Sequence, residues 1–341
     1  MGYCSSFDQT GNVERKYLYN IEHTDKVFTP VSSSAAQSFL SGYDLGELVS
    51  LKGIASGIEN SNFFLTSTKG EFVLTLFERL SAEQLPYYLE LMRHLESKSV
   101  ACAAPLPNAE GRLLGQCEGR PAALVRRLKG RDVSSPAPEH CALVGAELAK
   151  SHLAVADFGL RQPNLRGLAW WQQVLPNLWP RMPAAMVRLT ENELEAQQRF
   201  HQSAGYLRLP KGAVHADLFR DNVLFEQPPS PAASTQSPVL GGFIDYYFAG
   251  DDAFLFDLAV AYNDWTHERP ANGQSMLSAY AGLKPFTSNE RVAWPMMRRT
   301  AAFRFLVSRL DDWYRPRPAE MLTAKDPAYF EAILNPCRSS E

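Results

Sequence analysis

Residues 215–222 read His-Ala-Asp-Leu-Phe-Arg-Asp-Asn and place a carboxylate, Asp217, five residues before an amide, Asn222. A second carboxylate, Asp245, follows beyond a loop rich in proline and serine. Phosphoryl transfer from a nucleotide needs a group that holds the attacking hydroxyl and oxygen ligands for the magnesium that bridges the phosphates. Magnesium is a hard cation that takes carboxylate and amide oxygens rather than sulfur. The spacing therefore predicts a kinase site in which Asp217 accepts or orients the hydroxyl proton, and Asn222 and Asp245 bind Mg²⁺.

The pattern His-x-Asp-x4-Asn is moderately specific by itself. It arises by chance in roughly one chain in a hundred of this length, and a lone Asp217 is equally typical of an Asx turn or a helix cap. The kinase interpretation gains weight because Asp245 and Asp257 follow in order. We assign supporting roles to two residues: the ring of His215 pins the loop, and the carboxylate of Asp257 braces it by hydrogen bonds.

The composition is that of an ordinary globular protein and excludes several function classes. Of the 341 residues, 45% are hydrophobic and 21% are charged, and the net charge of −3 provides no broad basic field for nucleic acid. The five cysteines are odd in number and none forms a Cys-x-x-Cys pair, so neither a zinc site nor a disulfide framework is indicated. Reduced thiols in a cytoplasmic protein are the simplest interpretation.

Neither a membrane span nor a secretory signal is expected. No apolar run approaches the ~18 residues of a spanning helix. Charged residues interrupt the start of the chain, which therefore lacks the apolar core of a signal peptide. We expect residues 1–27 to form a polar tail that is poorly ordered.

The first half of the chain predicts a small sheet with one helix. Residues 62–66 and 71–77 are rich in aromatic and β-prone side chains, and residues 68–70 between them, Thr-Lys-Gly, are typical of a hairpin turn. Pro86 suits the first turn of a helix, and 122–125 reads as another short buried strand. The helix is indicated by apolar residues that recur at helical spacing, namely Leu85, Tyr88, Leu89, Met92 and Leu95.

The second half predicts helices around the polar cluster. Apolar side chains repeat at helical spacing within 143–155 and again within 303–313. Residues 227–242 hold four prolines and three serines and read as a flexible hairpin tip. We expect two lobes with a ligand cleft between them, an N-terminal nucleotide-binding lobe over 28–126 and a C-terminal catalytic and substrate lobe over 127–341.

Several stretches of the chain, in the order in which they occur, resemble the aminoglycoside-phosphotransferase-like branch of the protein-kinase-like superfamily. The resemblance is closest to the homoserine kinase family of that branch. The resemblance implies an α+β, bilobal protein-kinase-like fold, with an antiparallel sheet and one helix in the small N-terminal lobe and a larger, mostly helical C-terminal lobe. It runs from about Val27 to about Trp265. Besides residues 215–222, the stretches that carry it are Gly53–Leu65, Val73–Glu78, Leu85–Leu89, Arg166–Trp171 and Asn263–Trp265.

The resemblance also implies which residues bind the nucleotide. Asp217 would be the catalytic aspartate, and Asn222 and Asp245 the magnesium ligands. The adenine of ATP would contact main-chain groups of a hinge, the Arg126 carbonyl and the Leu128 amide. A glycine-containing loop, by itself more typical of an ordinary turn, would cover the phosphates through Ser56, Gly57, Asn60 and Asn62.

One position departs from the wider kinase pattern. The strand that usually carries a phosphate-binding lysine has Thr75 at that place, as the homoserine kinases of this type also do. Lys52, Lys69 and Arg79 are nearby candidates for anchoring the phosphates, although each is more often a solvated surface charge. Glu90, on the predicted helix, stands where the usual partner of that lysine would be.

Homoserine presents an ammonium, a carboxylate and a primary hydroxyl to its enzyme. Arginine suits bidentate carboxylate binding, so Arg220 inside the loop, with Asp221 beside it, is the first candidate for substrate recognition. A structural ion pair within the loop is an equally good interpretation of Arg220. Weaker candidates are Asp264, Asn263, Trp170 and Trp171.

The leading hypothesis is ATP-dependent phosphorylation of L-homoserine, a step towards threonine, by a cytoplasmic enzyme that binds a small molecule and neither nucleic acid nor membrane. One alternative is another small-molecule kinase of the same fold, acting on choline, methylthioribose or an aminoglycoside. The other is a nucleotide-binding regulator without transfer activity, which Thr75 motivates. The intact Asp217 argues against the regulator, because a pure binder has no need of a hydroxyl-orienting aspartate.

Overall fold

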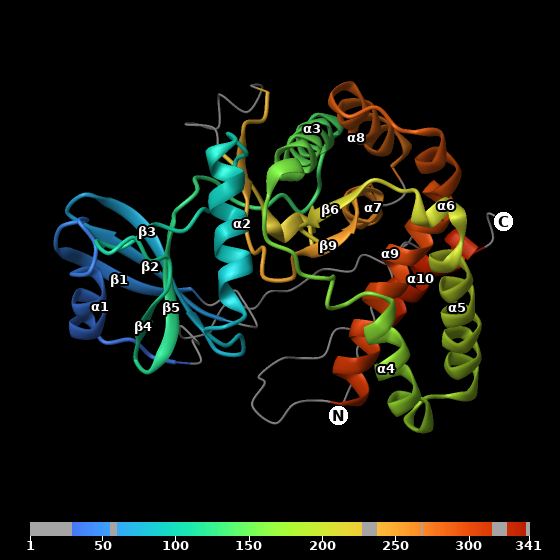
Figure 1. Cartoon of the computed structure of the whole chain (residues 1–341), viewed down its shortest axis with the longest axis horizontal. Coiled ribbons are helices and arrows are strands. Elements are labelled where there is room, and N and C mark those ends of the chain that lie inside the picture. The colour runs from blue at the N-terminus through green and yellow to red at the C-terminus, as the bar shows by residue number, and fades with distance from the viewer. Residues whose placement is uncertain (1–28, 55–59, 227–236, 267–268, 316–325, 339–341) are drawn as a thin grey trace, which may run out of the picture.

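The chain folds into a sheet-containing lobe and a larger helical lobe, with one helix between them (Figure 1). The computed structural model describes residues 29–54, 60–226, 237–266, 269–315 and 326–338. The predicted polar tail at 1–27 lies outside the described residues, as do positions 227–236 of the predicted hairpin tip. Within the described residues, no helix is both long and apolar enough to cross a membrane.

The N-terminal lobe is built on five antiparallel strands. Residues 66 and 71 pair across the predicted turn, which confirms the hairpin. One face of the sheet packs against the short helix α1 (Ser33–Leu40) around buried residues such as Leu65 and Leu74. In spatial order the strands are β1 (Leu48–Ile54), β2 (Asn60–Ser67), β3 (Gly70–Phe77), β5 (Arg120–Arg126) and β4 (Gly115–Cys117).

The predicted helix is α2 (Leu85–Ser97), which has Pro86 in its first turn and buries its apolar stripe. That stripe does not join the cluster that the sheet forms with α1. Leu95 belongs instead to a large buried cluster that contains Leu148 and Phe243 of the C-terminal lobe. The segment after α2 is tied to the same lobe, since Ala101 O accepts a hydrogen bond from Phe243 N at 2.8 Å. Most buried residues of the sheet form a second cluster, while Phe77 of β3 and Ala123 of β5 belong to the large one.

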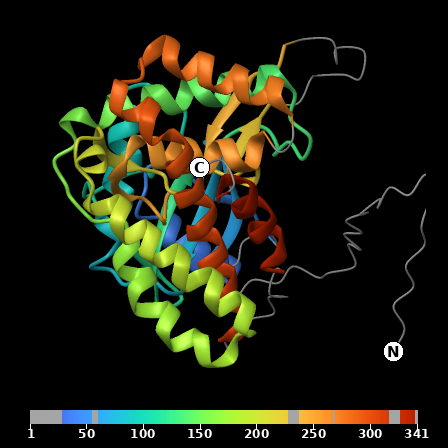
Figure 2. The ribbon, with the colours of Figure 1, turned by 90° about the vertical axis from the view of Figure 1, so that its right-hand side faces the viewer.

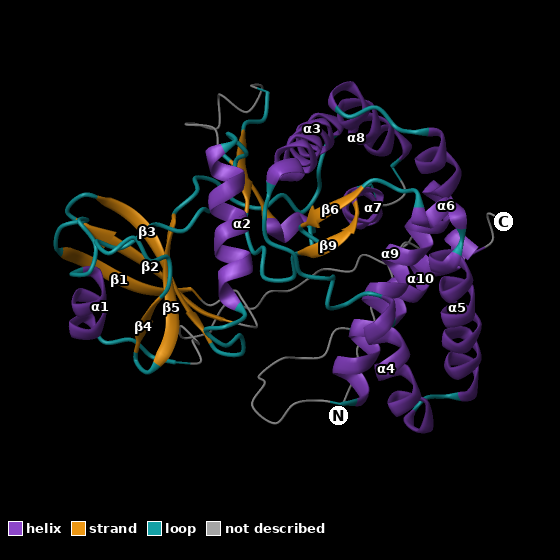
Figure 3. Ribbon diagram, viewed as in Figure 1, coloured by secondary structure: helices purple, strands orange, loops and turns teal. Residues whose placement is uncertain are grey.

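The C-terminal lobe is mostly helical, as expected (Figure 3). Helices α3 and α8 lie side by side, and α9 packs against α7 and α10 (Figures 1 and 2). The α-helices of this lobe are α3 (Pro138–Ala154), α4 (Leu168–Leu178), α5 (Ala184–Gln202), α6 (Ala204–Leu207), α7 (Phe254–Trp265), α8 (Pro270–Leu283), α9 (Ser288–Tyr314) and α10 (Ala328–Arg338).

Two short antiparallel pairs sit among these helices and flank the polar cluster. The strand β6 (Lys211–Val214) pairs with β9 (Gly250–Ala253), and β7 (Val223–Phe225) pairs with β8 (Leu240–Phe243). The chain between β6 and β7 is therefore held at both ends, which fixes where the segment 215–222 lies.

The connection between the lobes is short and anchored at its far end. Arg131 exchanges two main-chain hydrogen bonds with Phe225 of β7, at 2.9 and 2.8 Å. Gly130 next to it has a φ of +117°, and a Cβ there would lie 2.2 Å from Phe225 O, so glycine is required for this close approach. The predicted division between the lobes, at residues 126 and 127, coincides with the end of β5.

Candidate active site

The polar segment lies between β6 and β7, and the single-turn 3-10 helix η3 (Arg220–Asn222) closes it. Asn222 lies just before β7, and Ile244 lies just after the paired β8, so that Ile244 N donates to Asn222 O at 3.0 Å. This strand pairing brings the two parts of the predicted site together, because Asp245 follows Ile244 directly. Residues more than twenty positions apart in sequence thus share one edge of a two-stranded sheet.

Asp217 and Asn222 are in direct contact. The side-chain amide of Asn222 donates to Asp217 O at 2.8 Å and approaches Asp217 Oδ2 at 3.3 Å. With its nitrogen on Asp217, the amide has its oxygen available for another ligand. The contact brings together a carboxylate and an amide oxygen, the two groups for which the sequence predicts contact with the hydroxyl and with a cation.

Two of the four non-glycine residues with positive φ in the described part of the chain lie at this site. Ala216 has a φ of +64° and Asp245 a φ of +62°, in the left-handed region that residues other than glycine rarely adopt. Such conformations cost about 1–3 kcal/mol and persist where the surroundings impose them. Each of these two residues is at or beside a predicted functional group, so the fold holds Asp217 and Asp245 in place at an energetic cost.

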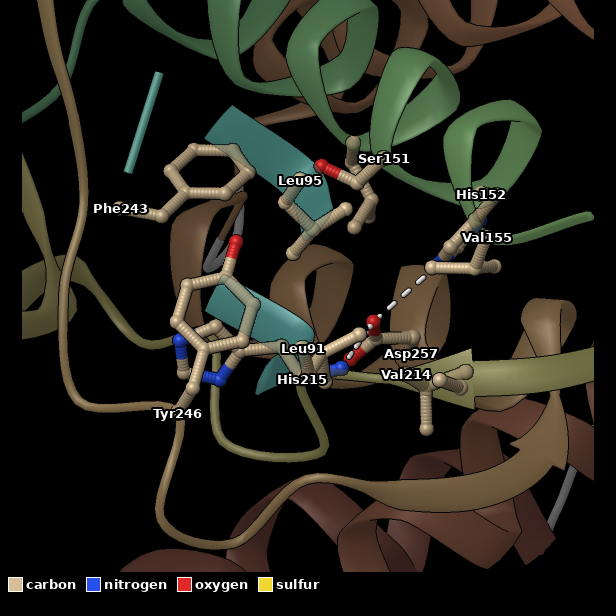
Figure 4. A pocket seen from close by; sticks show the side chains of 12 residues that line it. Leu91, Leu95, Ser151, His152, Val155, Val214, His215, Phe243, Tyr246 and Asp257 are labelled. Carbon is tan, nitrogen blue, oxygen red and sulfur yellow. Dashed lines mark hydrogen bonds and ion pairs between the residues drawn. The ribbon is translucent and has the colours of Figure 1, made fainter. Parts of the chain in front are cut away.

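Asp257, near the start of α7, holds the loop through its main chain (Figure 4). Its carboxylate accepts hydrogen bonds from the main-chain N–H groups of His215 and Ala216, both at 2.8 Å. The ring of His152 on α3 lies 3.2 Å from the same carboxylate, and its other nitrogen lies 2.8 Å from the Tyr280 hydroxyl on α8. Three helices therefore converge on one buried carboxylate that fixes the backbone just before Asp217.

Burial favours the neutral form of the surrounding imidazoles, whereas hydrogen bonds favour the ionised form of Asp257. It lowers the pKa of both His152 and His215. Burial also opposes ionisation of Asp257, but the hydrogen bond from His152 and the main-chain bond from His215 outweigh it and hold the pKa of Asp257 below its ordinary value. The result is a single buried negative charge whose oxygens accept several hydrogen bonds.

The ring of His215 ties the two halves of the site together. Its Nε2 lies 2.9 Å from Ile244 O, and its Nδ1 accepts a hydrogen bond from Asp217 N at 3.3 Å. The ring of Tyr246 lies over it, with 4.4 Å between ring centroids. His215 thus contacts the backbone on both sides of the site, which is the placement expected of the supporting role we proposed.

Asp217 is more basic than an ordinary aspartate. Burial raises its pKa to about 7, the Arg304 guanidinium opposes the rise, and the Asp245 and Asp221 carboxylates add to it. Nη2 of Arg304, on α9, lies 3.8 Å from Asp217 Oδ1. We did not select Arg304 from the sequence; the available signal was an arginine inside the apolar repeat over 303–313.

Arg220 is engaged elsewhere. Its guanidinium donates to both carboxylate oxygens of Asp264, at 3.1 and 3.3 Å, and to Ser134 O at 2.7 Å. Its main-chain N–H also donates to Asp264, at 2.8 Å. Arg220 therefore fits the ion-pair interpretation, with a partner on α7 rather than in its own loop. Asp221 beside it is exposed.

The predicted nucleotide residues are distributed over the N-terminal lobe. Ser56 and Gly57 lie outside the described residues, while Asn60 and Asn62 lie at the start of β2. Thr75, across from Asn62 on β3, donates its hydroxyl to the Asn62 side chain at 2.8 Å. The position that usually carries a phosphate-binding lysine is thus filled by the buried Thr75, which is hydrogen-bonded to the partly buried Asn62.

The remaining positions around the nucleotide are partly engaged. Arg126 ends β5 and Leu128 lies in the connection after it, where the two lobes join. Lys69 forms an exposed ion pair with Asp44 at 2.6 Å, which fits the surface-charge interpretation of that lysine. Glu90 lies 3.9 Å from Arg93 on its own helix.

The site has two side-chain oxygen groups that can bind magnesium, which is a usual number for a magnesium site in a protein. Asn222 and Asp245 supply one amide and one carboxylate, and magnesium usually takes one or two carboxylates and completes its shell with phosphates and water. Among the described residues no group of three or more His, Cys, Asp and Glu side chains is gathered for a metal. The donors therefore suit a cation shared with a phosphate.

Comparisons with known proteins agree with this geometry. A model of the phosphotransferase enzyme family matches residues 50–299. The chain is 50% identical over 315 residues to a homoserine kinase of Burkholderia multivorans, covering 90% of this chain and 94% of that protein. It is 49% identical over 319 residues to a homoserine kinase of Ralstonia pickettii, with the same coverage.

Solved structures show the fold. An amicoumacin kinase in complex with AMP-PNP, Ca²⁺ and amicoumacin superposes with a TM-score of 0.67 at 15% identity, over 91% of this chain and 93% of that one. A choline/ethanolamine kinase family protein from Mesorhizobium loti superposes with a TM-score of 0.58 at 16% identity, over 89% and 91% of the two chains.

Proposed function

This chain belongs to the homoserine kinase family within the phosphotransferase enzyme family, and from that premise we propose how its residues perform the reaction. The reaction is transfer of the γ-phosphoryl group of ATP to the hydroxyl of L-homoserine, a step in threonine biosynthesis. The observation that carries the assignment of roles is the contact of Asp217 with Asn222 beside Asp245.

Asp217 is the residue that meets the homoserine hydroxyl. Its carboxylate orients the hydroxyl for in-line attack and takes the proton as the bond to phosphorus forms. The strained Ala216 and the hydrogen bonds from His215 and Ala216 to Asp257 keep the carboxylate in position. Because chemistry at a phosphoryl group depends mostly on positioning and charge, this held backbone is the main contribution of the loop.

Asn222 and Asp245 are the ligands of Mg²⁺, which when bound neutralises charge on the phosphates. In the N-terminal lobe, Asn60 and Asn62 contact the phosphates together with Ser56 and Gly57, which lie outside the described residues, and the adenine contacts the main chain of Arg126 and Leu128. The division into a nucleotide lobe and a catalytic lobe follows from this arrangement. A cytoplasmic location suits the small-molecule reaction and the buried free thiols of four described cysteines.

The function is tested by measuring ADP release with a panel of hydroxylated substrates. We expect turnover with L-homoserine that exceeds turnover with choline, methylthioribose and an aminoglycoside by at least about 10³-fold in kcat/KM, because a site built to bind a carboxylate strongly rejects compounds that lack one. A mass-spectrometric assay should identify O-phospho-L-homoserine. Robust turnover of another compound in the panel without turnover of homoserine would reassign the substrate.

The metal ligands are tested by Asp245→Asn. Loss of a group that only supports a metal ligand costs about 10–100-fold in affinity, so loss of a ligand charge should raise the Mg²⁺ concentration for half-maximal activity by at least about tenfold. The measurement is a Mg²⁺ titration of kcat at saturating ATP and homoserine. Asp251→Asn, six positions along the chain, is the control and should titrate as the unaltered enzyme does. An unchanged Mg²⁺ requirement in Asp245→Asn would contradict the assignment.

A further inference from the structure

Two arginines from distant parts of the C-terminal lobe converge on one aromatic ring. Cζ of Arg304 lies 5.3 Å from the centroid of Phe248, and Cζ of Arg166 lies 5.8 Å from it. Phe248 is the third residue after Asp245. Arg166, just before α4, also lies over Trp170 at 4.5 Å, and Arg304 is in the middle of α9. Two guanidinium groups therefore lie near the same aromatic ring, which is close in sequence to Asp245.

Arg304 is buried beside the catalytic carboxylate. Its side chain is 4% exposed, and its Nη2 lies 3.8 Å from Asp217 Oδ1, further than the ~2.7–2.9 Å of a charge-assisted hydrogen bond. Its Nη1 donates to Ser308 at 3.2 Å, and its Cζ lies 3.9 Å from the centroid of Phe305. These contacts fix the guanidinium in orientation close to the place where the substrate hydroxyl binds.

The distance between Asp217 and Arg304 suits the distance between the hydroxyl and the carboxylate of homoserine. Its hydroxyl oxygen and its carboxylate are separated by three carbon atoms, a span of roughly 5 Å at ordinary bond lengths. A hydroxyl in contact with Asp217 thus leaves the carboxylate within reach of a cation that lies 3.8 Å from Asp217. Arginine has the planar fork that binds carboxylates in a bidentate manner. The first candidate from sequence, Arg220, has its fork on Asp264.

We propose that Arg304 and Arg166 bind the α-carboxylate of homoserine and so determine the selection of a hydroxy-amino acid over an amino alcohol. This inference rests on the proposed function, since it assigns the group that recognises the homoserine carboxylate. A carboxylate bound to the guanidinium of Arg304 would lie close to Asp217. Binding of the carboxylate therefore also places the hydroxyl against the catalytic aspartate.

A simpler role for Arg304 is a counter-charge for Asp217, and substrate analogues separate the two roles. 3-Aminopropan-1-ol is homoserine without its carboxylate, and 4-hydroxybutyrate is homoserine without its ammonium. The variants are Arg304→Lys, which keeps the charge but loses the fork, and Arg166→Met, which removes a more exposed guanidinium. Arg298→Lys is the matched control, because Arg298 lies on the same helix, over Tyr262 at 4.7 Å, and bonds to Asn263.

Each of the two variants is expected to lower kcat/KM for homoserine and for 4-hydroxybutyrate by roughly 10–100-fold, the usual effect of losing a hydrogen bond to a charged group. Most of the loss should be in KM. For 3-aminopropan-1-ol, kcat/KM should stay within about threefold of the unaltered enzyme. If its turnover is too slow to measure, its inhibition constant against homoserine provides the same comparison. Arg298→Lys should change none of these values.

Two results would overturn the inference while the proposed function stands. One is an equal loss for substrates with and without a carboxylate, which would indicate that Arg304 acts through Asp217. The other is full activity of Arg304→Lys and Arg166→Met on homoserine, since neither fork would then be needed. Failure of the proposed function is a different outcome, namely no turnover of homoserine by the unaltered enzyme.

Discussion

Replacing Asp217 with asparagine is expected to lower kcat for homoserine by about 10²–10⁴-fold, the contribution of a positioned general base. Asparagine keeps the size of the side chain, and its amide can still contact Asn222, but it accepts no proton at neutral pH. Affinity for ATP should stay within a few fold, because the proposed adenine contacts lie on the other lobe and the proposed Mg²⁺ ligands, Asn222 and Asp245, are unaltered. The measurements are steady-state ADP release and nucleotide binding by calorimetry. Turnover near that of the unaltered enzyme would refute the role of Asp217.

The same variant should also be more stable than the original protein in the absence of ligands. Burial raises the pKa of Asp217 from 3.8 to about 7, so the folded state binds a proton more tightly than the unfolded state does. The stabilisation that the protonated Asp217 side chain provides is therefore complete below about pH 4. It decreases as the pH rises to about 7, and it is absent above that pH. At pH 8 asparagine removes a cost of between about 1 and 4 kcal/mol.

Urea unfolding of the metal-free protein at pH 5 and pH 8 checks this sign. The gain in free energy of unfolding should be larger at pH 8 than at pH 5. Asp44→Asn provides the control, because Asp44 is an exposed carboxylate paired with Lys69. A smaller gain at pH 8 than at pH 5 would mean that Asp217 is stabilised, not destabilised, by its ionisation.

Asp257→Ala is expected to have the largest effect on stability, about 3–5 kcal/mol of destabilisation. Two main-chain N–H groups and the His152 ring would lose their acceptor in a site that is almost fully buried, and each buried donor left unsatisfied costs about 1–3 kcal/mol. The measurement is the free energy of unfolding in urea. Activity should fall as well, because the backbone that positions Asp217 loses its support.

A matched control is Asp264→Ala at the other end of α7. Asp264 accepts one main-chain hydrogen bond and pairs with Arg220, both nearer the surface than the contacts of Asp257. Its loss should cost clearly less than the loss of Asp257. Equal destabilisation by the two substitutions would show that the position of Asp257 among three helices has no special importance for stability.

Local patterns in the sequence predicted the local parts of the fold. The hairpin over 62–77 and the helix that begins at Leu85 follow from alternation, turn residues and helical spacing, all of which operate over a few residues. The order of the polar residues from His215 to Asp257 likewise predicted one shared site. These features need no knowledge of distant partners, so a single sequence contains enough information for them.

The features missed from the sequence depend on long-range contacts. Arg220 looked like a substrate ligand because it lies in the catalytic loop, yet its partner is 44 residues away on α7. Arg304 looked like one position in an apolar helical repeat, and only the packing of α9 brings it to Asp217. Long-range packing likewise brings both Arg166 and Arg304 close to the ring of Phe248. No local pattern distinguishes such an arginine from a solvated one.

The packing of α2 has a consequence for how the molecule can move. The helix shares its buried cluster with α3 and β8, and the chain after it is hydrogen-bonded to β8. The same chain is also bonded to the sheet, since Ala104 O accepts a hydrogen bond from Arg126 N at 3.0 Å. We therefore expect α2 and the catalytic loop to keep their relative positions when nucleotide is released.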